Sequence, residues 1–177
     1  PPEGIRFYGG GEGGLDFYWS RDWKDEQVEA LRFQIELALQ YDLPLVVHTR
    51  DAWDEMCMLM QEYAGRGLRG IMHSFCGSVD HYKALKGSGD FLFGIGGPVT
   101  YKRSTLPDTL REIPLAELVL ETDSPYLPPV PYRGKRNESA YVELVALKLA
   151  ELYGVTPEEV AETTTRNALR MFGEDLE

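Results

Sequence analysis

The sequence predicts an α/β protein in which helices cover a parallel sheet. Along most of the 177 residues, short apolar segments alternate with stretches whose apolar residues recur at helical spacing. The apolar segments are continuous, as is typical of strands buried on both faces of a parallel sheet. The length suits one domain with a sizeable core, and residues 1–177 are therefore taken as a single domain.

Five segments are predicted as strands. The first runs into a group of glycines, which allow a sharp turn or a close backbone approach, so we expect this strand to end at Glu12. The second is a short apolar run that ends in His48, and the third ends in His73. The five predicted strands are Phe7–Glu12, Leu45–His48, Gly70–His73, Phe91–Ile95 and Leu118–Leu120.

The segments between and after these strands predict helices. The clearest helix contains Val28, Leu31 and Ile35 at helical spacing, with charged residues between them. Near the C-terminus, Gly154 is a plausible helix stop, and the sequence 156–159 (T-P-E-E) fits a capping box with proline at the first helical position. The predicted helices are Asp22–Tyr41, Ala52–Tyr63, Val79–Lys86, Pro107–Ile113, Glu138–Tyr153 and Asn167–Phe172.

The composition narrows the class of protein. No apolar run approaches the ~20 residues that a membrane span needs, and the start has no signal-peptide pattern. Two cysteines are too few for a disulfide framework and suit a reducing cytoplasm, so we expect a cytoplasmic protein with no membrane partner. The net charge of −11 argues against a broad surface that coats nucleic acid, but not against an enzyme that holds a few phosphates locally.

Four candidate metal ligands lie at the ends of predicted strands: Glu12, His48, His73 and Asp123. Because parallel strands share one carboxyl edge, we expect these side chains to converge, where they suit Zn²⁺, Mn²⁺ or a related ion. Such an ion can activate water for attack on an ester or amide, and Glu12 could bridge two ions. A single histidine at a strand end is more often a hydrogen-bonded core residue, but two histidines with two carboxylates favour a metal site.

Several neighbouring residues have two possible roles. Glu121 shares a strand face with Asp123, where it could orient a histidine ligand or form a buried ion pair. Arg50 could contact substrate, or the Arg50-Asp51 pair could cap the next helix. His81 lies in a short polar helix and is interpreted as a solvated surface residue.

The proline-rich loop that follows Asp123 holds the densest basic cluster of this acidic chain. Arg133, Lys135 and Arg136 lie there within four residues. Arginine binds phosphate and carboxylate groups through its planar fork of donors. A carboxylate that could hold a metal is therefore followed by cations that could hold an anionic substrate.

These motifs together resemble the TatD family of metal-dependent deoxyribonucleases. The resemblance covers nearly the whole chain, and its longest motif, at 120–138, is highly specific. The matching stretches are G-E-G-G-L-D-F-Y-W at 11–19, V-V-H-T-R-D-A at 46–52, M-H-S-F-C-G-S at 72–78, L-E-T-D-S-P-Y-L-P-P-V-P-Y-R-G-K-R-N-E at 120–138 and A-E-T-T-T-R-N-A-L-R-M-F-G at 161–173.

The resemblance implies a TIM-barrel (β/α)₈ fold and a hydrolase that cleaves DNA with one or two Mg²⁺, Mn²⁺ or Zn²⁺ ions. Glu12 would bridge the metals and take part in catalysis, and His48 and His73 would bind one ion. Asp123 would bind the other ion and could act as a base toward the attacking water. Arg133 and its basic neighbours would face the DNA phosphates.

The chain departs from the family pattern at its start. Family members begin with a strand that carries a His-x-His pair, whereas the histidines here are at positions 48, 73 and 81. A complete barrel typically needs ~250 residues, so we expect a partial barrel of about five βα units that binds one ion well and a second weakly. The alternatives are a hydrolase of a small ester, lactone or amide, and a catalytically impaired truncated barrel that binds a partner.

Overall fold

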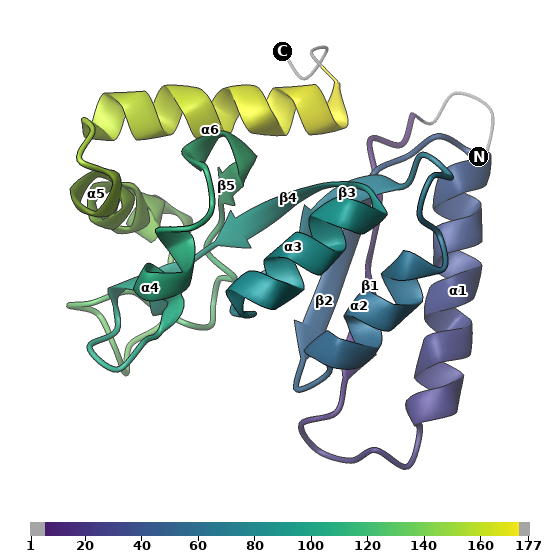
Figure 1. The fold of residues 1–177 in the computed structure, drawn as a ribbon. Helices are drawn as coiled ribbons and strands as arrows, with labels where there is room; N and C mark the ends of the chain where they lie inside the picture. The colour runs from purple at the N-terminus through teal and green to yellow at the C-terminus, as the bar shows by residue number, and fades with distance from the viewer. Residues whose placement is uncertain (1–5, 174–177) are drawn as a thin grey trace. The chain divides into compact units, whose positions relative to one another are not determined.

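The computed structural model describes residues 6–173 (Figure 1). Strands and helices alternate along this part of the chain, as the sequence predicts. The chain forms two compact units, which we describe separately. Of the described residues, the first comprises 6–73, 80–91 and 169–173, and the second comprises Ser74–Val79 and Leu92–Ala168.

The first unit is built on three parallel strands, β1 (Gly10–Asp16), β2 (Leu45–Arg50) and β3 (Arg69–Met72). Neighbours in the sheet are neighbours in sequence, since β1 pairs with β2 and β2 pairs with β3. Helix α1 (Lys24–Gln40) packs against β1, and α2 (Trp53–Gln61) follows β2 (Figure 1). Each of these strands is therefore joined to the next by a segment that contains a helix, and β3 is likewise followed by a helix, α3 (Val79–Ser88).

The buried side chains of this unit come from the positions that the periodicity selects. In α1 they are Leu31, Ile35 and Ala38, and in α2 they are Met56, Leu59 and Met60. Two ion pairs join the exposed face of α1 to the end of α2 and the turn after it: Arg32 with Glu62, and Arg66 with Glu36. The apolar core and these surface pairs fix α1 and α2 beside each other.

Strand β1 begins and ends later than predicted, at Gly10–Asp16 instead of Phe7–Glu12. The glycines do not form a turn but lie inside the strand, where neighbouring chain leaves no room for side chains. A Cβ atom at Gly14 would lie 1.9 Å from the carbonyl oxygen of His48 on β2. The prediction took these glycines for a strand end, whereas they permit close approach of two paired strands.

The second unit contains β5 (Leu118–Leu120), which pairs in parallel with β4 (Asp90–Ile95). Phe93 on β4 stacks edge to face with Phe75, with ring centroids 4.8 Å apart. The hydroxyl of Tyr153 donates to the main-chain oxygens of Leu110 and Ile113, at 2.8 Å each. The remaining elements are η1 (Gly97–Thr100), α4 (Leu106–Leu110), η2 (Leu115–Glu117), η3 (Ser139–Tyr141), α5 (Val142–Tyr153) and α6 (Pro157–Phe172).

The helical tail confirms the predicted stop at Gly154 and the predicted start at Pro157, but α5 begins at Val142 and not at Glu138, and one predicted division is corrected. Gly154 ends α5 in the left-handed conformation, with φ of 68°, and the Thr156 hydroxyl accepts the Glu159 N–H at 3.1 Å. The predicted short helix Asn167–Phe172 is instead the end of the single helix α6. Within residues 6–173, no helix has the length and apolar character needed to cross a membrane.

Candidate metal centre

Three of the four predicted ligands come together in the first unit. Glu12, His48 and His73 each offer one ligand atom, and these atoms all lie within 4.8 Å of one another. Oε1 of Glu12 lies 3.1 Å from Nδ1 of His48 and 3.8 Å from Nε2 of His73. Two imidazole nitrogens and a carboxylate oxygen at this spacing fit a divalent ion such as Zn²⁺ or Mn²⁺.

Glu12 reaches the cluster from a bulge inside β1, and the prediction that it ends the strand was wrong. Gly10 lies opposite Leu45 and Gly13 opposite Val47, so β1 has one more residue than β2 over this interval. Bulges of this kind re-aim a side chain and are frequent beside active sites. Gly11 has a φ of 145°, and a Cβ there would lie 2.8 Å from the Val46 carbonyl oxygen, so the bulge requires glycine.

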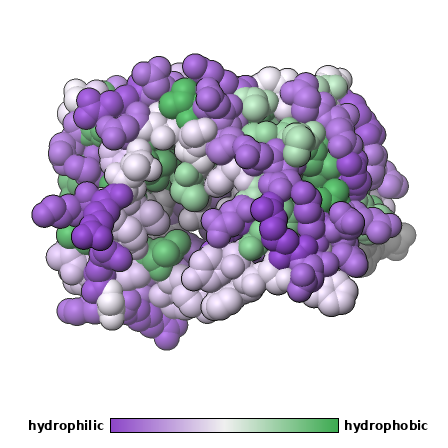
Figure 2. All heavy atoms as spheres, turned by 60° about the horizontal axis from the view of Figure 1, so that its bottom comes forward, coloured by the Kyte–Doolittle hydropathy of each residue, from purple (hydrophilic) through white to green (hydrophobic). Residues whose placement is uncertain are grey.

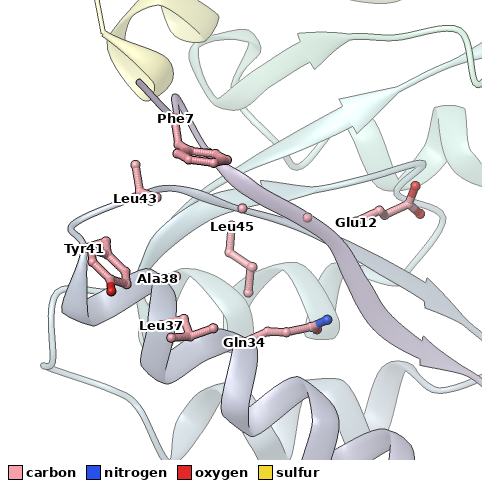
Figure 3. Close-up of a pocket in the computed structure, with 11 residues that line it drawn as sticks. Phe7, Glu12, Gln34, Leu37, Ala38, Tyr41, Leu43 and Leu45 are labelled. Carbon is pink, nitrogen blue, oxygen red and sulfur yellow. The ribbon is translucent and has the colours of Figure 1, made fainter. Parts of the chain in front are cut away.

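An apolar pocket of about 400 Å³ lies behind this bulge, between β1 and α1. The Glu12 carboxylate points away from the apolar side chains of the pocket (Figure 3). The metal cluster therefore lies outside this pocket. The lining residues are Phe7, Gly9, Gly10, Gly11, Glu12, Gln34, Leu37, Ala38, Tyr41, Leu43 and Leu45.

His48 lies between two carboxylates. Its Nδ1 faces Glu12, and its Nε2 lies 3.1 Å from Oδ2 of Asp16, the last residue of β1. Burial raises the pKa of Asp16, but hydrogen bonds from the Tyr18 N–H and from His48, together with the charge of Arg50, outweigh burial and lower that pKa. Sequence analysis missed Asp16 because it ended the strand at Glu12. The sequence signal that could have identified Asp16 is its place as an acidic residue directly after the apolar Leu15.

His73 follows β3 directly, as predicted. Its main-chain N–H donates to the Val47 carbonyl at 2.9 Å, which continues the pairing between β2 and β3 up to the ligand. The His73 side chain is 15% exposed, whereas that of Glu12 is 47% exposed. The centre is therefore most buried at His73 and most accessible to solvent at Glu12, and His48, at 34% exposed, lies between them.

Asp123 lies in the second unit, three residues after β5, and its role as a fourth ligand stays a prediction. Its backbone is left-handed, with φ of 57°, and its carbonyl accepts the Tyr126 N–H at 2.8 Å. Glu121 accepts a hydrogen bond from the main-chain N–H of Ser74 at 2.9 Å. Glu121 therefore holds the chain segment that begins directly after His73.

Asn137 organises the loop that carries Asp123, and sequence analysis missed it. Its side chain is 2% exposed, and Nδ2 donates to the carbonyls of Thr122 and Tyr126 at 2.6 Å each. Its own N–H donates to the Pro125 carbonyl at 3.0 Å. One buried amide thus closes the proline-rich loop onto itself. No sequence signal distinguishes this asparagine from a solvated loop residue.

The predicted substrate-binding cations lie beside aromatic rings. The Arg133 guanidinium lies 4.2 Å from the ring centroid of Tyr101, and the Lys135 ammonium lies 5.8 Å from that of Tyr132. Arg136 is exposed. In the first unit, Arg50 lies 3.5 Å from the ring centroid of Tyr18. Contact of these four cations with substrate stays a prediction.

Two expectations about neighbouring residues are corrected. Helix α2 begins after Ala52 with no side-chain capping bond, so the Arg50-Asp51 pair does not cap it. His81 is not a solvated surface residue, because its side chain is 24% exposed, Nε2 lies 2.9 Å from Oδ1 of Asp54, and its ring stacks on Trp53. His81 therefore forms a structural pair between α2 and α3.

Comparison with known proteins identifies the family. The family model described as TatD related DNase matches residues 6–173. The uncharacterized metal-dependent hydrolase YabD of Bacillus subtilis is 44% identical over 92% of this chain and 64% of its own length. The uncharacterized metal-dependent hydrolase YcfH of Escherichia coli is 39% identical over 92% of the chain and 61% of its own length. The chain thus spans less than two thirds of the length of these relatives.

Solved structures agree. The Escherichia coli TatD homolog YJJV superposes with a TM-score of 0.84 at 32% identity, over 92% of this chain and 62% of that one. A hydrolase TatD family protein from Entamoeba histolytica superposes with a TM-score of 0.79 at 23% identity, over 94% and 63%, and shows the fold alone. The predicted α/β fold of TIM-barrel type, with about five βα units, is confirmed. This chain belongs to the TatD related DNase family.

Proposed function

We propose that this chain is part of a divalent-metal-dependent hydrolase that cleaves DNA phosphodiester bonds. The observation that carries the proposal is the cluster of Glu12, His48 and His73 in a chain of the TatD related DNase family. The relatives YabD and YcfH are named as metal-dependent hydrolases, which supports the hydrolase class, and the family description supports DNA as substrate. A cytoplasmic location remains part of the proposal.

In the proposed reaction, one or two Mg²⁺, Mn²⁺ or Zn²⁺ ions would supply Lewis-acid activation of water and of the scissile phosphate. His48 and His73 would hold one ion through ring nitrogens, and Glu12 would contribute a carboxylate oxygen on the more exposed side of the centre. Asp123 accepts the proton of the attacking water as general base. Glu12 and Asp123 are thus the catalytic carboxylates of the proposal.

In this proposal, a small group of cationic residues binds the substrate, in place of a broad cationic surface. Figure 2 shows a face on which hydrophilic residues predominate and smaller groups of hydrophobic residues lie between them, and the net charge of −11 argues against a broad cationic surface for a duplex. Arg133, Lys135 and Arg136 form the cationic group that would bind phosphates, and Arg50 is a further candidate beside the first unit's cluster.

Two other functions remain as rivals. The acidic surface favours a small ester, lactone or amide as substrate, since such a molecule needs no cationic track. The second rival is a catalytically impaired chain that binds a partner, and absence of bound metal in the purified chain would favour it. Replacing Arg133, Lys135 and Arg136 by glutamine distinguishes the proposed DNase from a hydrolase of small molecules. The replacement should weaken cleavage of DNA, but it should spare hydrolysis of a small neutral substrate.

The proposal is tested by DNA cleavage with the 177-residue chain in Mg²⁺ or Mn²⁺, with EDTA as control. Glu12→Ala and Asp123→Ala should abolish cleavage, whereas Asp54→Ala, which removes a carboxylate paired with the structural His81, should not. Metal-dependent cleavage that survives both Glu12→Ala and Asp123→Ala would contradict the assignment of the catalytic carboxylates. Tight metal binding without cleavage of any DNA would favour the rivals.

A further inference from the structure

We propose that Asp16 is a positioning residue for the metal centre, which fixes the ring orientation and tautomer of His48. The inference rests on the metal-binding part of the proposed function, and its tests do not depend on DNA cleavage. Carboxylates that accept the second N–H of a metal-binding histidine set which nitrogen faces the metal. Neither the motifs nor the ligand cluster assigns Asp16 a role.

The register of β1 and β2 places His48 between the two acidic residues. Gly14 lies opposite His48, and Glu12 and Asp16 lie two residues to either side on the same face of β1. The imidazole lies across this gap, with Nδ1 3.1 Å from Glu12 and Nε2 3.1 Å from Asp16. Nδ1 faces Glu12, another of the three clustered ligands, so Nε2 is the nitrogen left for a supporting hydrogen bond.

Asp16 is itself held through both its carboxylate and its main chain. Its Oδ1 accepts the Tyr18 N–H at 3.0 Å, which leaves Oδ2 for His48. Gln27 on α1 binds both main-chain groups of Asp16: Oε1 accepts the Asp16 N–H at 2.8 Å, and Nε2 donates to the Asp16 carbonyl at 3.0 Å. The carboxylate therefore has one orientation, which is what a residue that orients a ligand requires.

The two oxygens of Asp16 give the proposal a sharp consequence. In Asp16→Asn the Tyr18 N–H still needs an acceptor, so the amide oxygen takes the place of Oδ1 and the NH₂ group faces His48. An NH₂ group donates, so Nε2 must accept and the imidazole proton moves to Nδ1. The proton then occupies the nitrogen that faces Glu12 and blocks it as a ligand. Asp16→Ala, in contrast, leaves both tautomers accessible.

The chain contains a matched control. His81 and Asp54 form the same kind of pair, with Nε2 2.9 Å from Oδ1, in the same unit but on α3 and α2. His81 stacks on Trp53 and is not one of the three clustered ligands. Asp54→Asn thus makes the same chemical change to a histidine–carboxylate pair that does not support the metal centre.

The experiment measures Zn²⁺ affinity of the 177-residue chain by calorimetry for the wild type and for Asp16→Ala, Asp16→Asn and Asp54→Asn. Outer carboxylates contribute about 10- to 100-fold to metal affinity. We expect a loss of roughly 10-fold for Asp16→Ala, a larger loss of roughly 100-fold for Asp16→Asn, and no change for Asp54→Asn. Circular dichroism and thermal denaturation confirm that each variant is folded.

A second readout is the proton position itself. In the zinc-loaded wild type, ¹H–¹⁵N correlation of the His48 ring should show the proton on Nε2 and the metal on Nδ1. Zinc on Nε2 with the proton on Nδ1 would overturn the proposal, as would equal affinities of Asp16→Asn and the wild type. A greater loss in Asp16→Ala than in Asp16→Asn would also overturn it, because that order indicates only lost packing.

Discussion

The Glu12–His48–His73 cluster of the first unit and the Asp123 loop of the second unit are held in different ways. The cluster lies on paired strands, and its geometry follows from register, the bulge in β1 and glycines that permit close approach. Asp123 lies in a proline-rich loop that has no strand partner over residues 122–138 and is closed by the amide of Asn137. The backbone of the paired strands positions the three clustered ligands, whereas the side chain of Asn137 positions the loop that carries Asp123.

This difference predicts two kinds of response to substitution. Closely packed strands cannot accept a larger side chain without a shift of the backbone, so larger residues in β1 should disrupt the whole cluster. A loop held by a few hydrogen bonds can open locally while the rest of its unit stays folded. The predictions below test this contrast, beginning with the largest expected effect.

Gly14→Val should disrupt the first unit. Its Cβ would lie 1.9 Å from the His48 carbonyl oxygen, and that contact is with backbone on a paired strand. The loss of stability should exceed about 3 kcal/mol, measured by urea denaturation, and Zn²⁺ binding should be lost with it. Gly87→Ala is the matched control, because a Cβ at Gly87 on α3 meets no atom within 4 Å, and it should stabilise by up to about 1 kcal/mol. A tolerated Gly14→Val would contradict the close approach of β1 and β2.

Substitution of a predicted metal ligand should affect Zn²⁺ binding differently in the two regions. His48→Ala removes a ligand from the strand-borne cluster and should weaken the tightest Zn²⁺ site by roughly 100-fold or more. Asp123→Ala should leave that site within a few-fold and affect only a second, weaker ion. Calorimetric titration of both variants measures the two effects. Two equally tight sites in the wild-type chain would contradict this division.

Asn137→Ala should loosen the loop around Asp123. It removes a buried amide and leaves the part-buried carbonyls of Thr122 and Tyr126 without their donor, at a cost of about 1–3 kcal/mol. Limited proteolysis should then cut within residues 122–138. Asn167→Ala, which removes a buried amide that donates to the Leu118 and Leu115 carbonyls, should cost a similar amount without exposing this loop. Equal proteolysis of the two variants would show that Asn137 does not hold the loop.

The sequence predicted the parts of the site that depend on periodicity and motif. The apolar runs correctly predicted strands that carry or immediately precede His48 and His73, but β2 continues to Arg50 beyond its predicted end at His48, and β3 ends at Met72, one residue before His73. The bulge at Glu12 was not predicted, since glycine permits both a turn and a close approach and only the neighbouring strand decides between them.

The residues that sequence analysis missed act through tertiary hydrogen bonds. Asp16 bonds to His48, 32 residues away, and Asn137 bonds to the carbonyl of Thr122, 15 residues away. Neither contact has a periodicity that a sequence could display. His81 is a similar case. Its polar helix predicts an exposed side chain, but in the folded chain the ring contacts Asp54 and Trp53 on another helix.

The smallest expected effect comes from the surface ion pairs of the first unit. The hydrogen bond from Arg32 lowers the pKa of Glu62, and the bond from Arg66 lowers that of Glu36. Because both pKa values are lower in the folded state, their stabilising effect is complete above the unfolded value, near 4.5, and disappears as pH falls through the folded values. All four side chains are at least 40% exposed, so the effect should be small and screened by salt.

The double variant Glu36→Gln, Glu62→Gln should therefore melt slightly below the wild type at pH 7 in low salt, and level with it near pH 3 or in 1 M salt. Glu29→Gln removes one charge from the same helix and serves as control. A difference that persists at pH 3 would show that the two glutamates act through packing, and that α1 and α2 are joined by more than charge.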